Sequence, residues 1–321
     1  MRISEREFVE EVRREAKHKV ALRPRGLTLR QGIGDDCAIL AYSPQKDLLV
    51  TTDFFLEGVH FRREWEAAHS VGHKALARAL SDIAAMGGIP RYAFLSLALS
   101  RTIKQNWIQE FLKGFLELSE SQKVILAGGD TSASPDGVIT DVMVIGEITK
   151  GQAIRRDGSR AGDEIWVTGS LGNAALALSL LRGGKKPLLS QLPFRVLFYP
   201  QPRLHIGRYL RQRKLATAMI DISDGLSIDL ARLCEESGTG ARIAEEAIPR
   251  FPPVTIQQAL HGGEDMELLF TVPPKRSAML PKSIGGVPLT RIGTIIPGRK
   301  LWLVRGDGKS RPLPILGFQH F

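Results

Sequence analysis

The chain has 321 residues, a formal net charge of +10 at pH 7, 43% hydrophobic residues and 24% charged residues. This composition excludes disordered and fibrous proteins, and the length exceeds one average domain, so we expect a globular protein with two domains that share an interface. The longest apolar runs, such as residues 93–99, are far shorter than the roughly 20 residues of a membrane span, so we expect no span.

The first half of the chain predicts a mixture of helices and strands. Ser4 and Glu7 form a capping box, and the apolar spacing that follows predicts a helix to about Lys19. Periodicity then predicts strands over residues 37–42, 48–52, 93–99, 124–127 and 138–148, and helices over residues 69–86 and 102–121. Asp82 lies near the C-terminal end of the helix over residues 69–86, where the helix dipole disfavours an anion, so we expect a compensating cation.

Other acids are predicted at strand ends. Asp36 precedes the strand over residues 37–42, and Asp53 ends the next strand. Gly128, Gly129 and Asp130 are predicted to end the strand over residues 124–127. These positions would place carboxylates on loops.

The second half begins after a basic, glycine-bearing, aperiodic segment over residues 150–163, which is the best candidate for a domain boundary. We therefore expect an N-terminal domain over residues 1–150 and a C-terminal domain over residues 151–321. The elements predicted in the second half are a strand over residues 164–168, a helix from near Gly172, a proline-rich connection over residues 187–202, a helix from Leu204, a strand that ends at Asp221, and a helix over residues 224–237. Both halves mix strands and helices, which predicts an α/β or α+β fold with two domains.

The positive charge and the cysteines narrow the class of protein further. Residues 272–321 carry nine Lys and Arg against one acid, away from most of the acidic motifs. Basic stretches of this kind are usually solvated surfaces, and we expect no nucleic-acid partner. The two cysteines, Cys37 and Cys234, predict neither a disulfide framework nor a zinc site, and the charged N-terminus lacks a secretory signal, so we expect a cytoplasmic protein.

Two common phosphate-binding devices are excluded by the motifs themselves. Gly308-Lys309-Ser310 resembles the end of a Walker A loop, but Leu303 replaces its first glycine and Pro312 blocks the helix that should follow. Gly32-Ile33-Gly34 opens like a dinucleotide fingerprint, but two aspartates follow where a pyrophosphate would lie.

The remaining possibility is phosphate binding through metal ions held by scattered carboxylates. Mg²⁺ prefers oxygen ligands and usually takes one or two carboxylates together with substrate phosphates. Any one of these acids alone is more often a turn or N-cap residue. Six together favour a metal-rich phosphate site, and they are Asp36, Asp53, Asp82, Asp130, Asp221 and Asp224.

Nine short segments carry recognisable motifs, namely residues 32–38, 51–53, 57–61, 80–87, 128–131, 167–169, 221–226, 262–268 and 317–321. Taken in order, these motifs resemble those of the thiamine-monophosphate kinase family. Single motifs are shared with a wider superfamily that includes ATP-dependent aminoimidazole ribonucleotide synthetase, selenophosphate synthetase and hydrogenase maturation factors, whereas the full set points to the kinase.

The resemblance implies a homodimer that pairs through its N-terminal domains and binds ATP and several Mg²⁺ ions. It also implies direct transfer of the γ-phosphoryl group of ATP to thiamine monophosphate, without a protein nucleophile. The implied metal ligands are Asp36, Thr51, Thr52, Asp53, Asp82, Asp130, Asp221 and Asp224. The implied ATP contacts are Gly129, Asp130, Arg156 and Ser223, and the implied contacts to the thiamine substrate are His60, Glu264 and Phe318.

Two alternatives remain open at this point. The nearer one is another ATP-dependent synthetase or maturation factor of the same superfamily, which a C-terminal cysteine would favour. This chain ends in Phe321. The alternative from a different class is a basic nucleic-acid-binding or regulatory module on a degenerate ATPase scaffold, which predicts that the carboxylates are lost, although all are present here.

Overall fold

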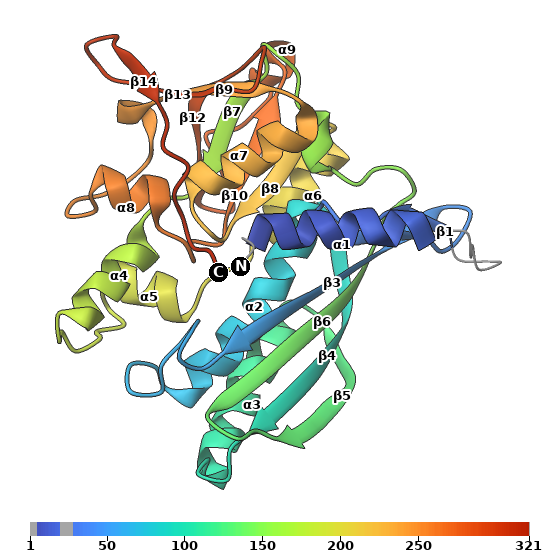
Figure 1. Cartoon of the computed structure of the whole chain (residues 1–321), viewed down its shortest axis with the longest axis vertical. Helices are drawn as coiled ribbons and strands as arrows, with labels where there is room; N and C mark the ends of the chain where they lie inside the picture. Colours follow the sequence, from blue (N-terminus) through green and yellow to red (C-terminus); the bar gives the residue numbers. More distant parts are fainter. Residues whose placement is uncertain (1–4, 20–27, 321) are drawn as a thin grey trace.

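The computed structural model describes residues 5–19 and 28–320. Ser4, one half of the predicted capping box, lies outside these ranges. The described residues form two β-sheets with helices packed against them, and Figure 1 shows the first sheet in the lower half of the view and the second in the upper half. The prediction of a mixed α/β fold is therefore confirmed.

The first sheet has six strands in the order β1-β2-β3-β6-β4-β5, and only β4 and β5 pair in parallel within it. Its strands are β1 (Thr28–Gln31), β2 (Ala38–Ala41), β3 (Lys46–Leu56), β4 (Ile89–Leu99), β5 (Ile125–Ala133) and β6 (Val138–Thr149). Two helices, α2 (Ala68–Ala85) and α3 (Gln105–Ser121), accompany it. A Cβ atom on Gly72 of α2 would lie 1.9 Å from the carbonyl oxygen of Phe111, so only glycine permits this close approach of the two helices.

The second sheet has eight strands, ordered β14-β13-β9-β12-β7-β10-β8, with β11 paired to β12. Its strands are β7 (Glu164–Thr168), β8 (Ala218–Ile222), β9 (Gly240–Ala244), β10 (Glu267–Val272), β11 (Ser283–Ile284), β12 (Val287–Ile296), β13 (Leu301–Val304) and β14 (Ser310–Pro312). The helices of this half are α4 (Asn173–Arg182), α5 (Leu192–Phe198), α6 (Leu204–Gln212), α7 (Leu226–Ser237), α8 (Ile256–His261) and α9 (Pro274–Ser277).

The two sheets share one hydrophobic core. This core contains Ile83 of α2 and Leu49 of β3, which belong to the first half, together with Met219 of β8 and Phe270 of β10. The α2 helix therefore packs both against its own sheet and against the second half. Polar side chains at the edges of this shared core meet at the junction of the two halves.

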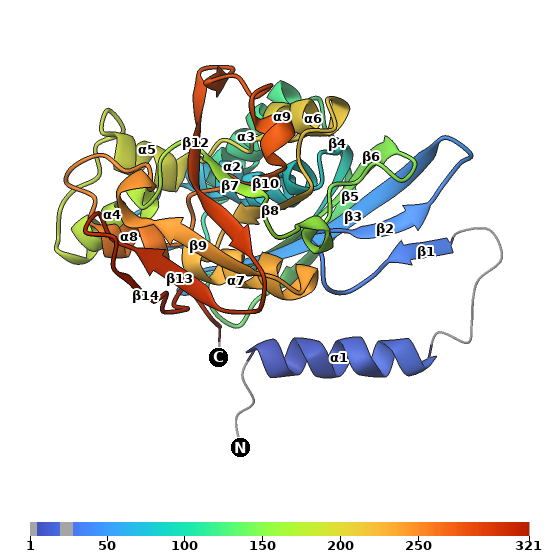
Figure 2. The ribbon, with the colours of Figure 1, turned by 90° about the horizontal axis from the view of Figure 1, so that it is seen from above.

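Helix α1 (Glu5–Lys19) agrees with the predicted first helix and lies apart from both sheets in Figure 2. Ion pairs hold it to the C-terminal end of α7: Arg13 lies 2.7 Å from Glu236, and Arg6 contacts Glu235. Among the described residues, no helix is both long enough and apolar enough to cross a membrane.

Three local predictions were wrong. Asp53 does not end a strand, because β3 continues to Leu56, and Asp130 lies inside β5, which extends to Ala133. In both cases neighbouring strands continue the hydrogen-bonded ladder past the polar residue, so tertiary pairing overrides the local turn signal. The proline-rich connection contains helix α5, whose Pro193 occupies the first turn, where its missing N–H group costs no hydrogen bond.

Candidate active site at the junction of the two halves

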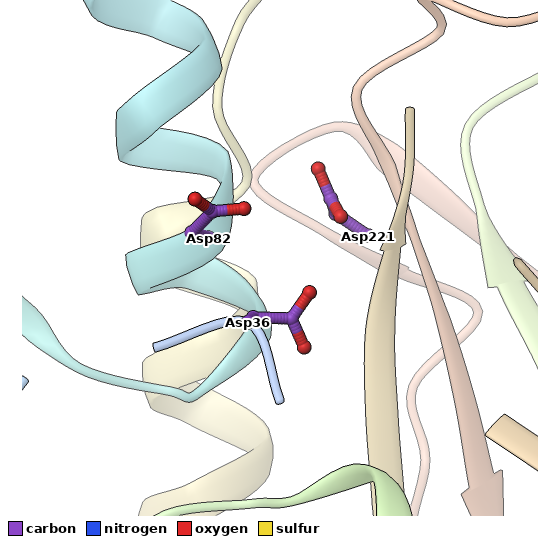
Figure 3. Close-up of side chains that lie close together, drawn as sticks. All are labelled: Asp36, Asp82 and Asp221. Carbon is purple, nitrogen blue, oxygen red and sulfur yellow. The ribbon is translucent and has the colours of Figure 1, made fainter. Parts of the chain in front are cut away.

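Three aspartates from separate parts of the chain converge at the junction. Asp36 lies on the loop before β2, Asp82 on the last turn of α2, and Asp221 on β8, and Figure 3 shows their carboxylates turned toward one another. One oxygen from each lies within 4.8 Å of one from each of the others. Asp36 and Asp221 are buried, and Asp82 is half-buried. The structure therefore brings together three of the six acids selected from the sequence.

Neighbouring side chains fix the orientation of these carboxylates. The hydroxyl of Thr51 donates a hydrogen bond to Asp82, and Ser81 Oγ donates one of 2.7 Å to Asp221. The guanidinium of Arg156 donates two hydrogen bonds to Asp36, from Nη2 at 2.7 Å and from Nε at 3.1 Å. Arg156 thus compensates the charge of one acid, whereas hydroxyl groups supply no charge to the other two.

Burial and mutual repulsion perturb these acids strongly. Burial raises the pKa of Asp82 well above its ordinary value, and the charges of Asp221 and Asp36 raise it further. The pKa of Asp221 is raised for the same two reasons, burial first and then the charge of Asp36. A divalent cation would reverse this penalty, and an all-oxygen donor set fits a hard cation such as Mg²⁺. The residues present are therefore suited to the expected metal.

A second group of charged residues surrounds Arg78. Arg78 of α2 lies 3.1 Å from Asp53 and 2.5 Å from Glu264, so one guanidinium joins the first sheet to the loop before β10. Burial raises the pKa of Asp53 despite this ion pair. Asp224 pairs at 2.5 Å with Arg232 of α7. Its backbone N–H donates to Asp229 at 3.1 Å, so this amide at the start of α7 is already satisfied.

A pocket of about 180 Å³ opens beside this group, and it contains the three residues expected to contact the thiamine substrate, His60, Glu264 and Phe318. Ser223 and Asp224 also line it. The His60 ring lies 6.0 Å from the Phe318 ring, measured between centroids. Burial, with the positive charge of Arg78, lowers the pKa of His60 to about 3, so the imidazole is neutral at physiological pH.

The structure separates other expected site residues from the three-aspartate cluster. Thr52 donates a 2.6 Å hydrogen bond to Asp141 and is exposed, because side chains alternate between the two faces of β3 and Thr51 takes the inner face. Strand register aligns Asp130 with Ser96 and Asp141, which places it on the same outer face as Thr52. Gly129 is also exposed, beside Asp130 on β5.

Sequence reasoning selected Arg156 and Phe318 but missed two other cations and two other aromatic rings of the site. Lys74 and Arg78 lie eight and four residues before Asp82, so all three occupy one face of α2, and this spacing was a readable signal. Trp65 and His320 line the pocket as well. No local pattern distinguishes Trp65 from an ordinary core residue.

Comparison with known proteins shows the family of the chain. The family model for the N-terminal domain of AIR synthase related proteins matches residues 34–148, and the model for the C-terminal domain matches residues 160–304. The thiamine-monophosphate kinase of Bacillus subtilis is 35% identical over 303 residues, which covers 90% of this chain and 93% of that protein. The thiamine-monophosphate kinase of Salmonella typhimurium is 35% identical over 323 residues, with coverage of 95% and 96%.

A solved structure of AaThiL complexed with AMPPCP and TMP superimposes with a TM-score of 0.84 at 30% identity, and the match covers 100% of this chain and 99% of that one. Both family models and the full-length relatives therefore match the chain over nearly its whole length. The chain belongs to the thiamine-monophosphate kinase family, within the AIR synthase related proteins.

Proposed function

We propose that the chain transfers the γ-phosphoryl group of ATP directly to the phosphate of thiamine monophosphate, giving thiamine diphosphate and ADP. The observation that carries this proposal is the adjacency of two features. Arg78 lines the pocket together with His60, Glu264 and Phe318, and it also pairs with Asp53. Besides burial, the charge of Asp53 raises the pKa of Asp82 in the three-aspartate cluster, so the pocket and the cluster are neighbours. An acceptor ring in the pocket would thus place its phosphate toward the acids.

The expected metal would be held by Asp36, Asp82 and Asp221, and we propose Thr51, Thr52, Asp53, Asp130 and Asp224 as further ligands. When bound, Mg²⁺ would neutralise phosphate oxygens that otherwise repel one another. Thr52 and Asp130 lie on the outer face of the first sheet, so they are the weakest members of this set.

The chain's own residues then have to position the reactants and exclude water. Arg156 is a fixed cation beside the acids, and we propose that it contacts ATP together with Gly129, Asp130 and Ser223. The acceptor phosphate is already ionised at neutral pH, so the reaction needs no general base, and the neutral His60 is not required as one. We propose that His60, Glu264 and Phe318 orient the thiamine rings.

The larger organisation follows the family. We propose a domain boundary at residue 150, a cytoplasmic location, and a homodimer that pairs through the first sheet. The dimer is supported by the outer face of that sheet, on which exposed apolar side chains from three strands share one side: Phe54, Tyr92 and Ile125.

An acceptor assay tests the proposed function. ADP release should be measured in parallel with thiamine monophosphate, with thiamine and with no acceptor, and thiamine diphosphate should be identified by chromatography. We expect release to depend on thiamine monophosphate and on Mg²⁺. Release that proceeds equally well without an acceptor, or a preference for free thiamine, would contradict the proposal.

A further inference from the structure

A buried charge network lies behind the pocket, and Glu264 is the one member of it to which the proposed function gives a role. Lys74 of α2 is fully buried, and its Nζ lies 2.5 Å from Glu264 Oε2 and 3.8 Å from Glu66 Oε1. Glu66 lines the same pocket as His60 and Phe318. The two glutamates therefore share one ammonium group, and both face the space assigned to the acceptor.

The carboxyl of Glu66 is buried and incompletely paired. The residue is 4% exposed, and its Oε2 atom has no hydrogen-bond partner among the described residues. A buried polar atom left without a partner destabilises the protein, so a hydrogen-bond partner supplied by a ligand would remove this cost. Glu66 lies just before α2, and its backbone N–H donates a 3.0 Å hydrogen bond to the carbonyl of Arg62, which fixes the backbone there. This unpaired oxygen is therefore held in place beside the pocket.

The distribution of charge leaves Glu66 as the weaker of the two acids. Glu264 pairs with both Lys74 and Arg78 at 2.5 Å. Glu66 has only Lys74, whose Nζ lies 3.8 Å from its Oε1. Burial raises the pKa of Glu66 to about 7, so its neutral carboxyl is populated at physiological pH. A neutral carboxyl carries one hydrogen-bond donor and one acceptor in a single plane.

That pattern complements an amino group next to a ring nitrogen, which offers a donor beside an acceptor. We propose that Glu66 recognises the aminopyrimidine ring of thiamine monophosphate through this paired edge. Lys74 positions the carboxyl from behind, and Glu264 with its two cations stays outside the pairing. The inference rests on the proposed function for the identity of the ligand, and it assigns a specificity role to a residue outside the family motifs.

The test compares a ligand that has both rings with a ligand that has only the thiazole ring. Binding of thiamine monophosphate and of the phosphorylated hydroxyethylthiazole fragment, which lacks the pyrimidine, should be measured by calorimetry. Glu66→Ala should weaken binding of thiamine monophosphate by at least about tenfold, because it removes a buried hydrogen-bonding pair, while affinity for the thiazole phosphate stays within about twofold. Glu66→Gln keeps a donor and an acceptor in one plane and should restore most of the affinity.

The matched control is Glu64→Ala, which removes an exposed carboxylate from the same loop and should change neither affinity. Three results would overturn the inference: equal weakening for both ligands, no weakening for either, or failure of Gln to restore binding. The two proposals can fail separately. If the Glu66 variants bind as expected but the native protein transfers no phosphoryl group, the proposed function is refuted and the recognition role is still supported.

Discussion

At the scale of single residues, the convergence of three aspartates is costly for the protein without a bound cation. Arg156 compensates Asp36, but Asp82 and Asp221 receive hydrogen bonds from uncharged hydroxyl groups. Burial and the neighbouring acids disfavour the ionised form of both. The rest of the fold offsets the cost of placing these acids together.

The first prediction follows from this cost. Asp221→Asn preserves shape but removes one charge, so in EDTA it should stabilise the folded protein by roughly 1–2 kcal/mol. It should also abolish the rise in melting temperature on adding Mg²⁺, and lower turnover at least about a hundredfold. Calorimetric melting with and without Mg²⁺ measures the first two effects, and the assay of ADP release measures turnover.

The control for this prediction is Asp157→Asn. Asp157 lies on the short turn over Arg156–Gly158, and its part-exposed carboxylate pairs with Arg155. This variant should leave the Mg²⁺ response intact. An Asp221→Asn protein that melts like the native one in EDTA and still responds to Mg²⁺ would show that the cluster is not a metal site.

His60 gives a prediction about pH. Its pKa falls from 6.5 in the unfolded chain to about 3 in the fold, because it is buried and because Arg78, His320 and Lys74 oppose a second positive charge more than Glu264 favours it. Protonation therefore favours unfolding, so this contribution to stability is complete above pH 6.5 and is lost as the pH falls toward 3. At pH 5 the loss is roughly 2 kcal/mol.

His60→Asn keeps an acceptor near Nδ1 for the backbone N–H of Leu56 but cannot be protonated. Urea unfolding at pH 7.5 and pH 5 should therefore show a smaller drop in the variant than in the native protein, by about that amount. Equal drops would mean that His60 is not held neutral by the pocket.

At the scale of elements, the C-terminal tail closes one side of the pocket. Ser227 Oγ of α7 donates a 2.5 Å hydrogen bond to the carbonyl of Leu316, and the backbone N–H of Phe318 donates to the carbonyl of Asp224 at 3.1 Å. A Cβ atom on Gly317 would lie 2.6 Å from that same carbonyl, so glycine is needed for the close approach. These contacts aim Phe318 at His60.

The prediction at this scale is that Phe318→Ala raises the Michaelis constant for thiamine monophosphate by about tenfold and leaves that for ATP unchanged, since an aromatic face attracts a cationic ring by roughly 0.5–2 kcal/mol. Ile315→Ala, an exposed residue of the same tail, is the control and should change neither constant. Steady-state kinetics with each substrate varied in turn measures the difference. If both constants rose together in Phe318→Ala, the tail would serve the fold rather than the acceptor.

Sequence periodicity predicted most of these elements because amphipathic helices and alternating strands carry their own signal. The helix predicted over residues 69–86 and the strand predicted over residues 164–168 are examples confirmed by α2 and β7. What the pattern could not supply is which polar residues meet. Arg78 reaches Glu264 across 186 positions of sequence, and Thr52 turns away from Asp82 because of strand alternation.

The loop before β10 shows why the sequence could select Glu264 but could not predict where its side chain points. Glu264 and Met266 adopt positive φ angles of 70° and 50°, which L-residues rarely do. Hydrogen bonds from Glu264 N to Ser223 O at 2.7 Å and from Met266 N to Ile222 O at 3.0 Å hold this conformation. Because the contacts lie on β8 and the turn that follows it, the direction of the Glu264 side chain depends on tertiary structure that no local propensity encodes.

At the scale of the whole molecule, the junction of the two halves and the outer face of the first sheet have different roles. The junction is packed and charged, and both halves contribute to its core and its acids. The outer face is open: Val50, Ile145, Tyr92 and Ile125 form one row across four strands. An apolar row of this kind on a free surface is typical of a subunit interface.

The last prediction tests that interface. Ile125 is 59% exposed, and Ile125→Glu places a charge within the proposed contact, where burial without a partner would cost several kcal/mol. Native protein should sediment at twice the chain mass of 35.3 kDa, and the variant at the chain mass itself. Phe251→Glu supplies a matched control, because Phe251 is equally exposed at 59% but lies in the second half, so this variant should remain dimeric. If Ile125→Glu also stayed dimeric, or if the native chain were monomeric at micromolar concentration, the first sheet would not be the dimer surface, and its apolar row would need another partner.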